Sequence, residues 1–219
     1  MRRCLSDKTR AGKTGAGRMY MQRRTIKATG HAFLAFAIAL LATAGARAAS
    51  LGDAAPQLPR KAMPFGIQTA PGKYAWLNDY EGQTCVVAFI LTTCPHCQFT
   101  TGVLNKLQAE FGNRGVQFIE SAAEAMAGLH IADFKSKFHP AFPVGYNDQR
   151  YIAKFLGLPE DSPMMFPAIA MIDKHGMIRV QISGDDKSME KTIQEKSLQE
   201  AIEKTMEAGQ AAHREPAPK

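Results

Sequence analysis

Two cysteines separated by two residues are the part of this sequence best suited to chemistry. They belong to the segment Cys94-Pro95-His96-Cys97. Cysteine reacts as its thiolate, and a helix N-terminus stabilises a thiolate because unpaired N–H groups and the helix dipole present positive charge there. On a helical turn this spacing brings both sulfurs within reach of a disulfide. The segment therefore predicts a redox-active Cys94–Cys97 pair, with Cys94 as the exposed attacking thiol and Cys97 as the more buried resolving thiol.

The two residues between the cysteines suit the same position. Pro95 fits the first turn of a helix, where no backbone N–H is needed. His96 can add positive charge or a hydrogen bond beside the attacking sulfur. The dipeptide thus favours a reactive thiol at the start of a helix.

Structural zinc and an inert disulfide are the other uses of such a pair. Structural zinc takes four ligands, usually from two paired motifs. The sequence holds four cysteines and six histidines, without a second Cys-x-x-Cys. A disulfide that closes so short a loop removes little chain entropy and adds little stability. We therefore expect redox chemistry, with no resident metal and no organic cofactor.

The segments around the pair have the pattern that such a site requires. Residues 84–91 form a continuous β-branched and aromatic run, which predicts a central strand covered on both faces. Residues 95–111 carry an apolar stripe at three- and four-residue steps, which predicts a helix. The cysteines would thus lie where a buried strand ends and a helix begins. Cys85, at the start of the same strand, is too far along it to pair with Cys94 and is expected to be buried and inert.

The rest of the chain predicts further strands and helices in alternation. Residues 49–64 are expected to be an extended lead-in, and residues 72–82 a strand or turn followed by a short helical turn. Strands are expected over 116–120, 142–146, 168–172 and 178–182, and helices over 122–138, 151–156 and 188–208. Strands alternating with helices, then a hairpin and a last helix, predict an α/β fold with a layered sheet.

Positive charge is concentrated at the front of the chain. The protein has 219 residues, with 27 Lys and Arg against 20 Asp and Glu. Ten of these basic residues and one acidic residue precede residue 49, which leaves 17 basic and 19 acidic residues in the remainder. The remainder therefore has no basic excess with which to bind nucleic acid.

Residues 1–48 have the organisation of a secretory signal peptide. Basic residues at 23, 24 and 27 precede an uncharged, largely apolar run over 28–46. Ala46-Arg47-Ala48 then supplies the small residues that a signal peptidase recognises. We expect cleavage after Ala48 and export to the periplasm, with an uncleaved membrane anchor as the alternative. Met19 or Met21 is an alternative start of translation. After cleavage, we expect one domain over 49–208 and a disordered tail over 209–219.

Over residues 52–184 the chain resembles the TlpA/ResA-like thioredoxin proteins of the redoxin superfamily. The resemblance rests on Gly52-Asp53-Ala54-Ala55-Pro56, on the strand and motif over 86–97, and on Phe166-Pro167 with the block that follows over 168–176. It implies a thioredoxin-like fold, in which helices flank a central mixed β-sheet and an extra αβ insertion precedes a cis-proline at Pro167. It also implies that Phe166 offers its backbone to a bound substrate chain.

The same resemblance implies an enzyme, a thiol-disulfide oxidoreductase. Such an enzyme exchanges disulfides with protein substrates through a mixed disulfide, and a redox partner protein restores its pair. Two rival functions stay open. A copper-binding metallochaperone with this fold would use thiols and histidine as ligands. A peroxiredoxin-type peroxidase would need a threonine three residues before the attacking cysteine, where this chain has Leu91.

The chain departs from the family pattern at several functional positions, among them Thr93, where the family usually has tryptophan. Thioredoxins place a buried acid six residues before the first cysteine, where this chain has Ala88. We name Glu120, at the end of the next expected strand, as the candidate proton acceptor, with a solvated strand-end acid as the alternative. The Pro95-His96 dipeptide resembles that of DsbA-type oxidants, whereas the frame resembles reductants and cytochrome-maturation factors. The direction of electron flow therefore stays open.

Overall fold

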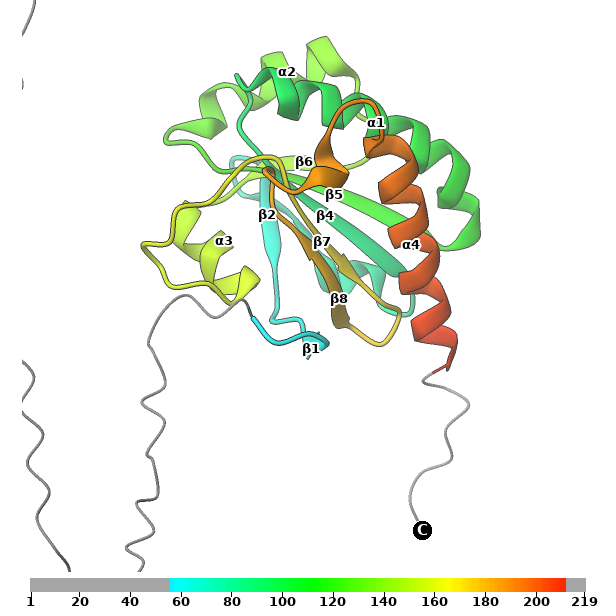
Figure 1. Ribbon diagram of the computed structural model, residues 1–219. Helices are drawn as coiled ribbons and strands as arrows, with labels where there is room; N and C mark the ends of the chain where they lie inside the picture. The colour runs from blue at the N-terminus through cyan, green and yellow to red at the C-terminus, as the bar shows by residue number, and fades with distance from the viewer. Residues whose placement is uncertain (1–55, 212–219) are drawn as a thin grey trace, which may run out of the picture. The chain divides into compact units, whose positions relative to one another are not determined.

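The structure, a computed structural model, describes residues 56–211. An eight-stranded sheet lies at its centre, and helices cover both faces of the sheet (Figure 1). The predicted signal peptide over 1–48, its alternative starts Met19 and Met21, and most of the predicted tail lie outside the described residues. The fold that positions the candidate site is therefore contained in the described part of the chain.

The sheet is mixed, as expected. Its strands follow the order β1-β8-β7-β4-β5-β6-β2-β3. At its centre β4 runs parallel to β5 and antiparallel to β7, and β5 runs parallel to β6. The strands are β1 (Arg60–Lys61), β2 (Gly66–Ala70), β3 (Lys73–Trp76), β4 (Thr84–Ile90), β5 (Val116–Ala122), β6 (Val144–Tyr146), β7 (Ala168–Ile172) and β8 (Met177–Ile182).

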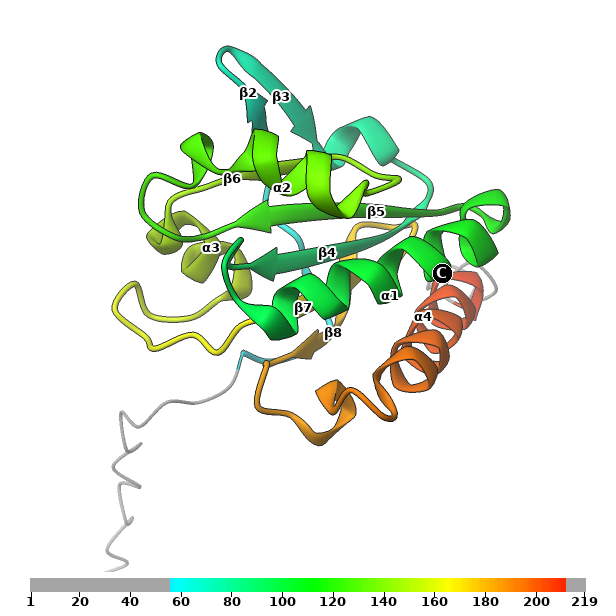
Figure 2. The same ribbon diagram turned by 90° about the horizontal axis from the view of Figure 1, so that it is seen from above.

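Three of the four longer helices in this part of the chain pack on one face of the sheet. The helices are α1 (Pro95–Phe111), α2 (Ile131–Phe138), α3 (Gln149–Leu156) and α4 (Gln194–Ala211). Apolar side chains of α1, α2 and α4 share one buried cluster, whereas those of α3 belong to a second cluster on the opposite face (Figures 1 and 2). Within residues 56–211, no helix combines the length and the apolar character needed to cross a membrane.

Strand β4 is covered on both faces of the sheet. Alternate side chains of a strand point to opposite faces. Val86, Ala88 and Ile90 join the cluster with α1, whereas Val87 and Phe89 join the cluster beneath α3. All seven residues of the strand are buried. The prediction of a central strand covered on both sides is confirmed. The end of this strand, at Ile90, places the start of α1 at Pro95.

The predicted insertion lies between β5 and β7. It comprises α2, β6 and α3, and it adds β6 to the sheet beside β5. The prediction of a helix over 122–138 is wrong in its first half, because β5 continues to Ala122. This residue pairs with Ile90 of β4 and Tyr146 of β6. A 3-10 turn over Ala127–Leu129 follows Met126, whose backbone is left-handed at φ 60°, and the helix begins only at Ile131.

The lead-in contains a strand, which is consistent with the expected extended segment, whereas the last helix differs from its prediction. The segment expected to be extended contains the short strand β1, which pairs with β8, and β2 follows it. The last helix begins at Gln194 rather than at 188, after a 3-10 turn over Lys187–Met189 that Asp186 caps by accepting the Ser188 N–H. It runs to Ala211, so residues 209–211, predicted to begin a disordered tail, are helical.

Gly184 packs directly against the loop that precedes β7. A Cβ atom at this position would lie 2.6 Å from the backbone carbon and 2.7 Å from the backbone oxygen of Phe166. We expect Gly184→Ala to lower the free energy of unfolding by about 1–3 kcal/mol, because backbone atoms must move to admit the methyl group.

Gly102, on the exposed side of α1, supplies the matched control. No atom lies within 4 Å of a Cβ built there. Gly102→Ala should raise the free energy of unfolding by roughly 0.5–1 kcal/mol, because alanine favours the helix. Urea denaturation of both variants measures the contrast, and equal effects at the two positions would contradict it.

Candidate active site

The two thiols of the motif lie at the start of α1, directly after β4. Cys94 is the N-cap residue of the helix, and its sulfur accepts the backbone N–H of Cys97 at 3.4 Å. Pro95 occupies the first turn. Cys94 is half-buried and Cys97 is fully buried, and both are free thiols in this structure. The position and the relative exposure of the two thiols are those that the sequence predicts.

Burial governs the chemistry of Cys97. The surrounding apolar side chains remove water, and this raises the pKa of the Cys97 thiol well above its ordinary value. The backbone N–H of Leu91, which donates to the Cys97 sulfur at 3.4 Å, opposes this effect. Cys94 and the negative charge of Glu120 raise the pKa further. A thiol held protonated in this way needs a base before it can act as a nucleophile.

Glu120 lies within the core rather than at a solvated strand end. It is wholly buried on β5, and the Thr101 hydroxyl donates to its Oε1 at 2.8 Å. Its Oε2 has no hydrogen-bond partner within the described residues. Burial raises the pKa of Glu120 to about 8, although the Thr101 hydrogen bond lowers it in part. An acid with this pKa exchanges protons near neutral pH.

The sheet register places Glu120 beside the position where thioredoxins have their acid. Ala88 of β4 and Glu120 of β5 are direct partners in the parallel ladder. Side chains at the same level of neighbouring strands point to the same face of a sheet. The carboxylate therefore reaches the face covered by α1 from one strand further along, and the small side chain of Ala88 leaves room for it.

His96 is attached to the turn before α4. Its Nε2 lies 2.8 Å from the carbonyl oxygen of Met189. A carbonyl only accepts hydrogen bonds, so Nε2 carries the hydrogen and donates it. This nitrogen is therefore engaged away from the two sulfurs, beside which the sequence analysis placed the imidazole.

The Phe166–Pro167 segment lies at the same edge of the sheet as the thiols. Its peptide bond is cis. Strand β7, which begins directly after Pro167, is antiparallel to β4, and its first residue, Ala168, pairs with Phe89 near the end of β4. The end of β4 and the start of β7 are therefore neighbours. The Gly184 N–H donates to the Met165 carbonyl at 3.0 Å and ties this loop to the chain after β8.

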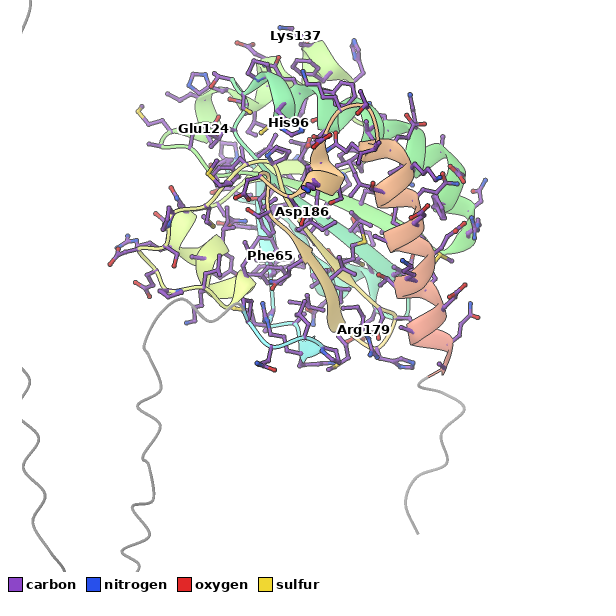
Figure 3. The ribbon with its side chains drawn as sticks, viewed as in Figure 1. Phe65, His96, Glu124, Lys137, Arg179 and Asp186 are labelled. Atoms are coloured by element: carbon purple, nitrogen blue, oxygen red, sulfur yellow. The ribbon has the colours of Figure 1, made fainter. Side chains whose placement is uncertain are left out.

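A clamp around Thr92 is the part of the site that the sequence analysis missed. The Glu124 carboxylate accepts the Thr92 backbone N–H at 3.0 Å and also the Thr92 hydroxyl. The side-chain amide of Gln98 donates to the Thr92 carbonyl at 2.8 Å. Figure 3 shows Glu124 and His96 at the end of the molecule opposite Arg179. Because Glu124 fell inside an expected helix, nothing in the sequence pattern marked it as a contact of the active-site loop.

Cys85 lies at the far end of β4 from the motif. It is buried, and burial raises its pKa to about 12, so this thiol stays protonated. It belongs to the cluster beneath α3, whereas Cys97 belongs to the cluster beneath α1. Among residues 56–211, no three side chains of histidine, cysteine, aspartate or glutamate lie close enough together to hold a metal ion.

Known proteins share this fold. A thioredoxin-family thiol:disulfide interchange protein from Chlorobium tepidum TLS matches 68% of this chain and 99% of its own at 22% identity and a TM-score of 0.54. The thioredoxin domain of a thiol-disulfide oxidoreductase from Bacteroides vulgatus matches 68% of this chain and 97% of its own, with 18% identity and a TM-score of 0.53. The architecture is therefore a thioredoxin-like fold, as expected.

Sequence comparison identifies the family. The redoxin family profile matches residues 51–202, and the chain belongs to this family. The thiol-disulfide oxidoreductase ResA of Bacillus thuringiensis subsp. konkukian is 24% identical over 129 residues, which are 59% of this chain and 71% of the relative. ResA of Bacillus anthracis is 26% identical over the same shares. These matches confirm the expected resemblance to TlpA/ResA-like thioredoxin proteins and the expected enzyme class, a thiol-disulfide oxidoreductase.

The burial of Glu120 predicts a specific dependence of stability on pH. Between its ordinary pKa of 4.5 and its pKa of about 8 in the fold, the folded protein holds a proton that the unfolded chain has released. Stability therefore falls as the pH rises through this window. Glu120→Gln stays neutral, so its free energy of unfolding relative to wild type should rise across the window, by roughly 3–5 kcal/mol.

Urea denaturation at a series of pH values tests this expectation. Glu207→Gln on α4 is the control, because it removes a carboxylate that is exposed rather than buried. The difference in free energy of unfolding between this control variant and wild type should stay constant between pH 4.5 and 8. A constant difference for Glu120→Gln as well would show that Glu120 is ionised in the fold at little cost.

Proposed function

We propose that this protein is an exported thiol-disulfide oxidoreductase that exchanges disulfides with protein substrates through Cys94 and Cys97. The observation that carries the proposal is a dithiol at a helix N-terminus whose buried member lies on the same face of the sheet as a buried acid. Cys94 reacts with substrate, Cys97 resolves, and Glu120 takes and returns the proton of Cys97. The relatives named as thiol-disulfide oxidoreductases support the same assignment.

The exchange proceeds in two displacements. The Cys94 thiolate attacks one sulfur of a substrate disulfide, forms a mixed disulfide, and releases the other substrate sulfur as a thiolate. Cys97 then passes its proton to Glu120 and attacks the Cys94 sulfur. This step forms the Cys94–Cys97 disulfide and releases the second substrate thiolate, so that the substrate is reduced and the protein oxidised. The same steps in reverse oxidise a substrate dithiol.

The helix start supports the role of Cys94 as the attacking thiol. The Cys97 N–H points at the Cys94 sulfur, and the positive end of the α1 dipole lies beside it. Both effects stabilise a thiolate. Cys97, in contrast, is enclosed by apolar side chains and is out of reach of a protein substrate.

The loop at Phe166 and Pro167 supports a site for the substrate chain beside the thiols. It lies at the edge of the sheet where β4 ends, and Phe166 is only partly buried. We assign to the Phe166 backbone the pairing with a bound substrate segment. The partners of the enzyme are then protein thiols and disulfides and a redox protein that restores the pair, and the exchange needs no metal or organic cofactor.

Trapping of mixed disulfides tests the two thiol roles. Cys97→Ser should accumulate a covalent complex with a substrate protein, because nothing resolves the bond at Cys94. Cys94→Ser should accumulate none. Cys85→Ser is the matched control and should exchange disulfides like wild type, since its thiol lies at the other end of β4. Non-reducing electrophoresis measures the complexes. Equal trapping by the two active-site variants would refute the assignment.

Export has its own test. The basic segment, the apolar run and Ala46-Arg47-Ala48 support cleavage after Ala48. Mass spectrometry of the protein from a periplasmic fraction should therefore find an N-terminus at Ala49. A full-length chain that remains in washed membranes would instead support an uncleaved anchor.

A further inference from the structure

Two consecutive threonines of α1, Thr100 and Thr101, differ in the hydrogen-bond acceptors near their hydroxyl groups. Thr100 and Thr101 are both 0% exposed. Each hydroxyl lies at hydrogen-bond distance from the carbonyl four residues earlier, Thr100 from that of His96 at 3.0 Å and Thr101 from that of Cys97 at 3.1 Å. Such a bond satisfies a threonine hydroxyl inside a helix. Thr101, however, has a second acceptor within reach.

The second acceptor of Thr101 is the Glu120 carboxylate, whose Oε1 lies 2.8 Å from the hydroxyl oxygen. A hydroxyl has one hydrogen and donates it to one acceptor at a time. An ionised carboxylate is a stronger acceptor than a backbone carbonyl. The hydroxyl therefore donates to Oε1 while Glu120 is charged. When Glu120 is protonated, the two acceptors become comparable and the Cys97 carbonyl can regain the bond.

The surroundings of Glu120 leave Thr101 as the polar side chain that contacts it. The neighbouring strands place Ala88 and Val144 beside Glu120, and neither side chain is polar. Its backbone N–H donates to the Pro143 carbonyl at 3.0 Å. The Cys97 thiol on α1 is near enough for the charge of Glu120 to raise its pKa.

We propose that Thr101 is a positioning residue of the exchange reaction, which holds Oε1 of the ionised Glu120 and leaves the unpartnered Oε2 to take the proton from Cys97. The proposal rests on the proposed function, since it assumes that Glu120 is the proton acceptor. The proton moves from the Cys97 sulfur to Oε2, and the electron pair left on sulfur attacks Cys94. Thr101 itself neither gains nor loses a proton in the step.

The expected consequence is a change in the pH at which Glu120 titrates. The Thr101 hydrogen bond favours the charged carboxylate and so lowers the pKa of Glu120. Thr101→Val replaces the hydroxyl with a methyl group of similar size. Without the donor, Glu120 should titrate about one pH unit higher than in wild type. The lower limb of the pH profile for resolution of a mixed disulfide should move upward by the same amount.

Two measurements test the inference. Carbon NMR of the labelled Glu120 carboxyl follows its titration directly, and stopped-flow kinetics follow resolution of a mixed disulfide between Cys94 and a small aromatic thiol. Thr101→Ser should titrate and react like wild type, because it keeps the hydroxyl. Thr100→Val is the matched control: it loses a buried hydroxyl that Gln194 contacts at 2.9 Å, but it should leave both pH profiles unchanged. Thr101→Ala supplies the same comparison if the valine variant does not fold.

The two readouts separate the possible failures. A Glu120 titration that is the same in Thr101→Val, Thr101→Ala and wild type would overturn the role of Thr101, and the proposed function would stand. If the Glu120 titration shifts but the pH profile of mixed-disulfide resolution does not, Glu120 is not the proton acceptor. That result would also refute the role of Thr101 in the reaction. Parallel shifts in both measurements support the inference.

Discussion

The loss of water around ionisable groups is the constraint on which this site depends. Cys97 belongs to the apolar cluster between α1 and the sheet, and Glu120 is wholly buried on the same face, so neither charged form is well solvated. Two negative charges so close together in this environment would be more unfavourable still. On the proposed function, formation of the Cys97 thiolate is therefore coupled to protonation of Glu120. The core supplies this coupling because it excludes solvent, and the helices that exclude the solvent are also those that position the thiols.

The geometry of a parallel ladder explains how the Glu120 carboxylate comes to lie on the face of the sheet that α1 covers. Ala88 and Glu120 lie at the same level of two adjacent strands and on the same face. A carboxylate that α1 covers can therefore come from either strand, provided that the other strand carries a small side chain at that level. In this protein the carboxylate comes from Glu120 of β5. The hydroxyl of Thr101 on α1 donates a hydrogen bond to one of its oxygens. Sheet register, more than distance along the sequence, decides which strand places an acid on this face.

Local patterns predicted the elements that carry the thiols, because those patterns are complete within a few residues. The apolar run over 84–91 and the stripe over 95–111 gave β4 and α1 nearly to their ends. The first part of the expected helix over 122–138 failed because β5 is extended there by pairing with strands distant in sequence. The burial of Glu120 and the contact of Glu124 with Thr92 depend on the same long-range pairing. A single sequence contains the residue types for these contacts but not their register.

The start of α1 is attached to the rest of the protein on two sides. His96 is bonded to the turn before α4, and Thr92 is held by Glu124 from the loop after β5. Local unfolding of the segment between these anchors would have to break contacts with both regions, which raises the free energy of such an opening. The backbone therefore has little freedom to rearrange when the two sulfurs join or separate. On the proposed function, the dithiol and disulfide forms would therefore present nearly the same surface to any protein that binds them.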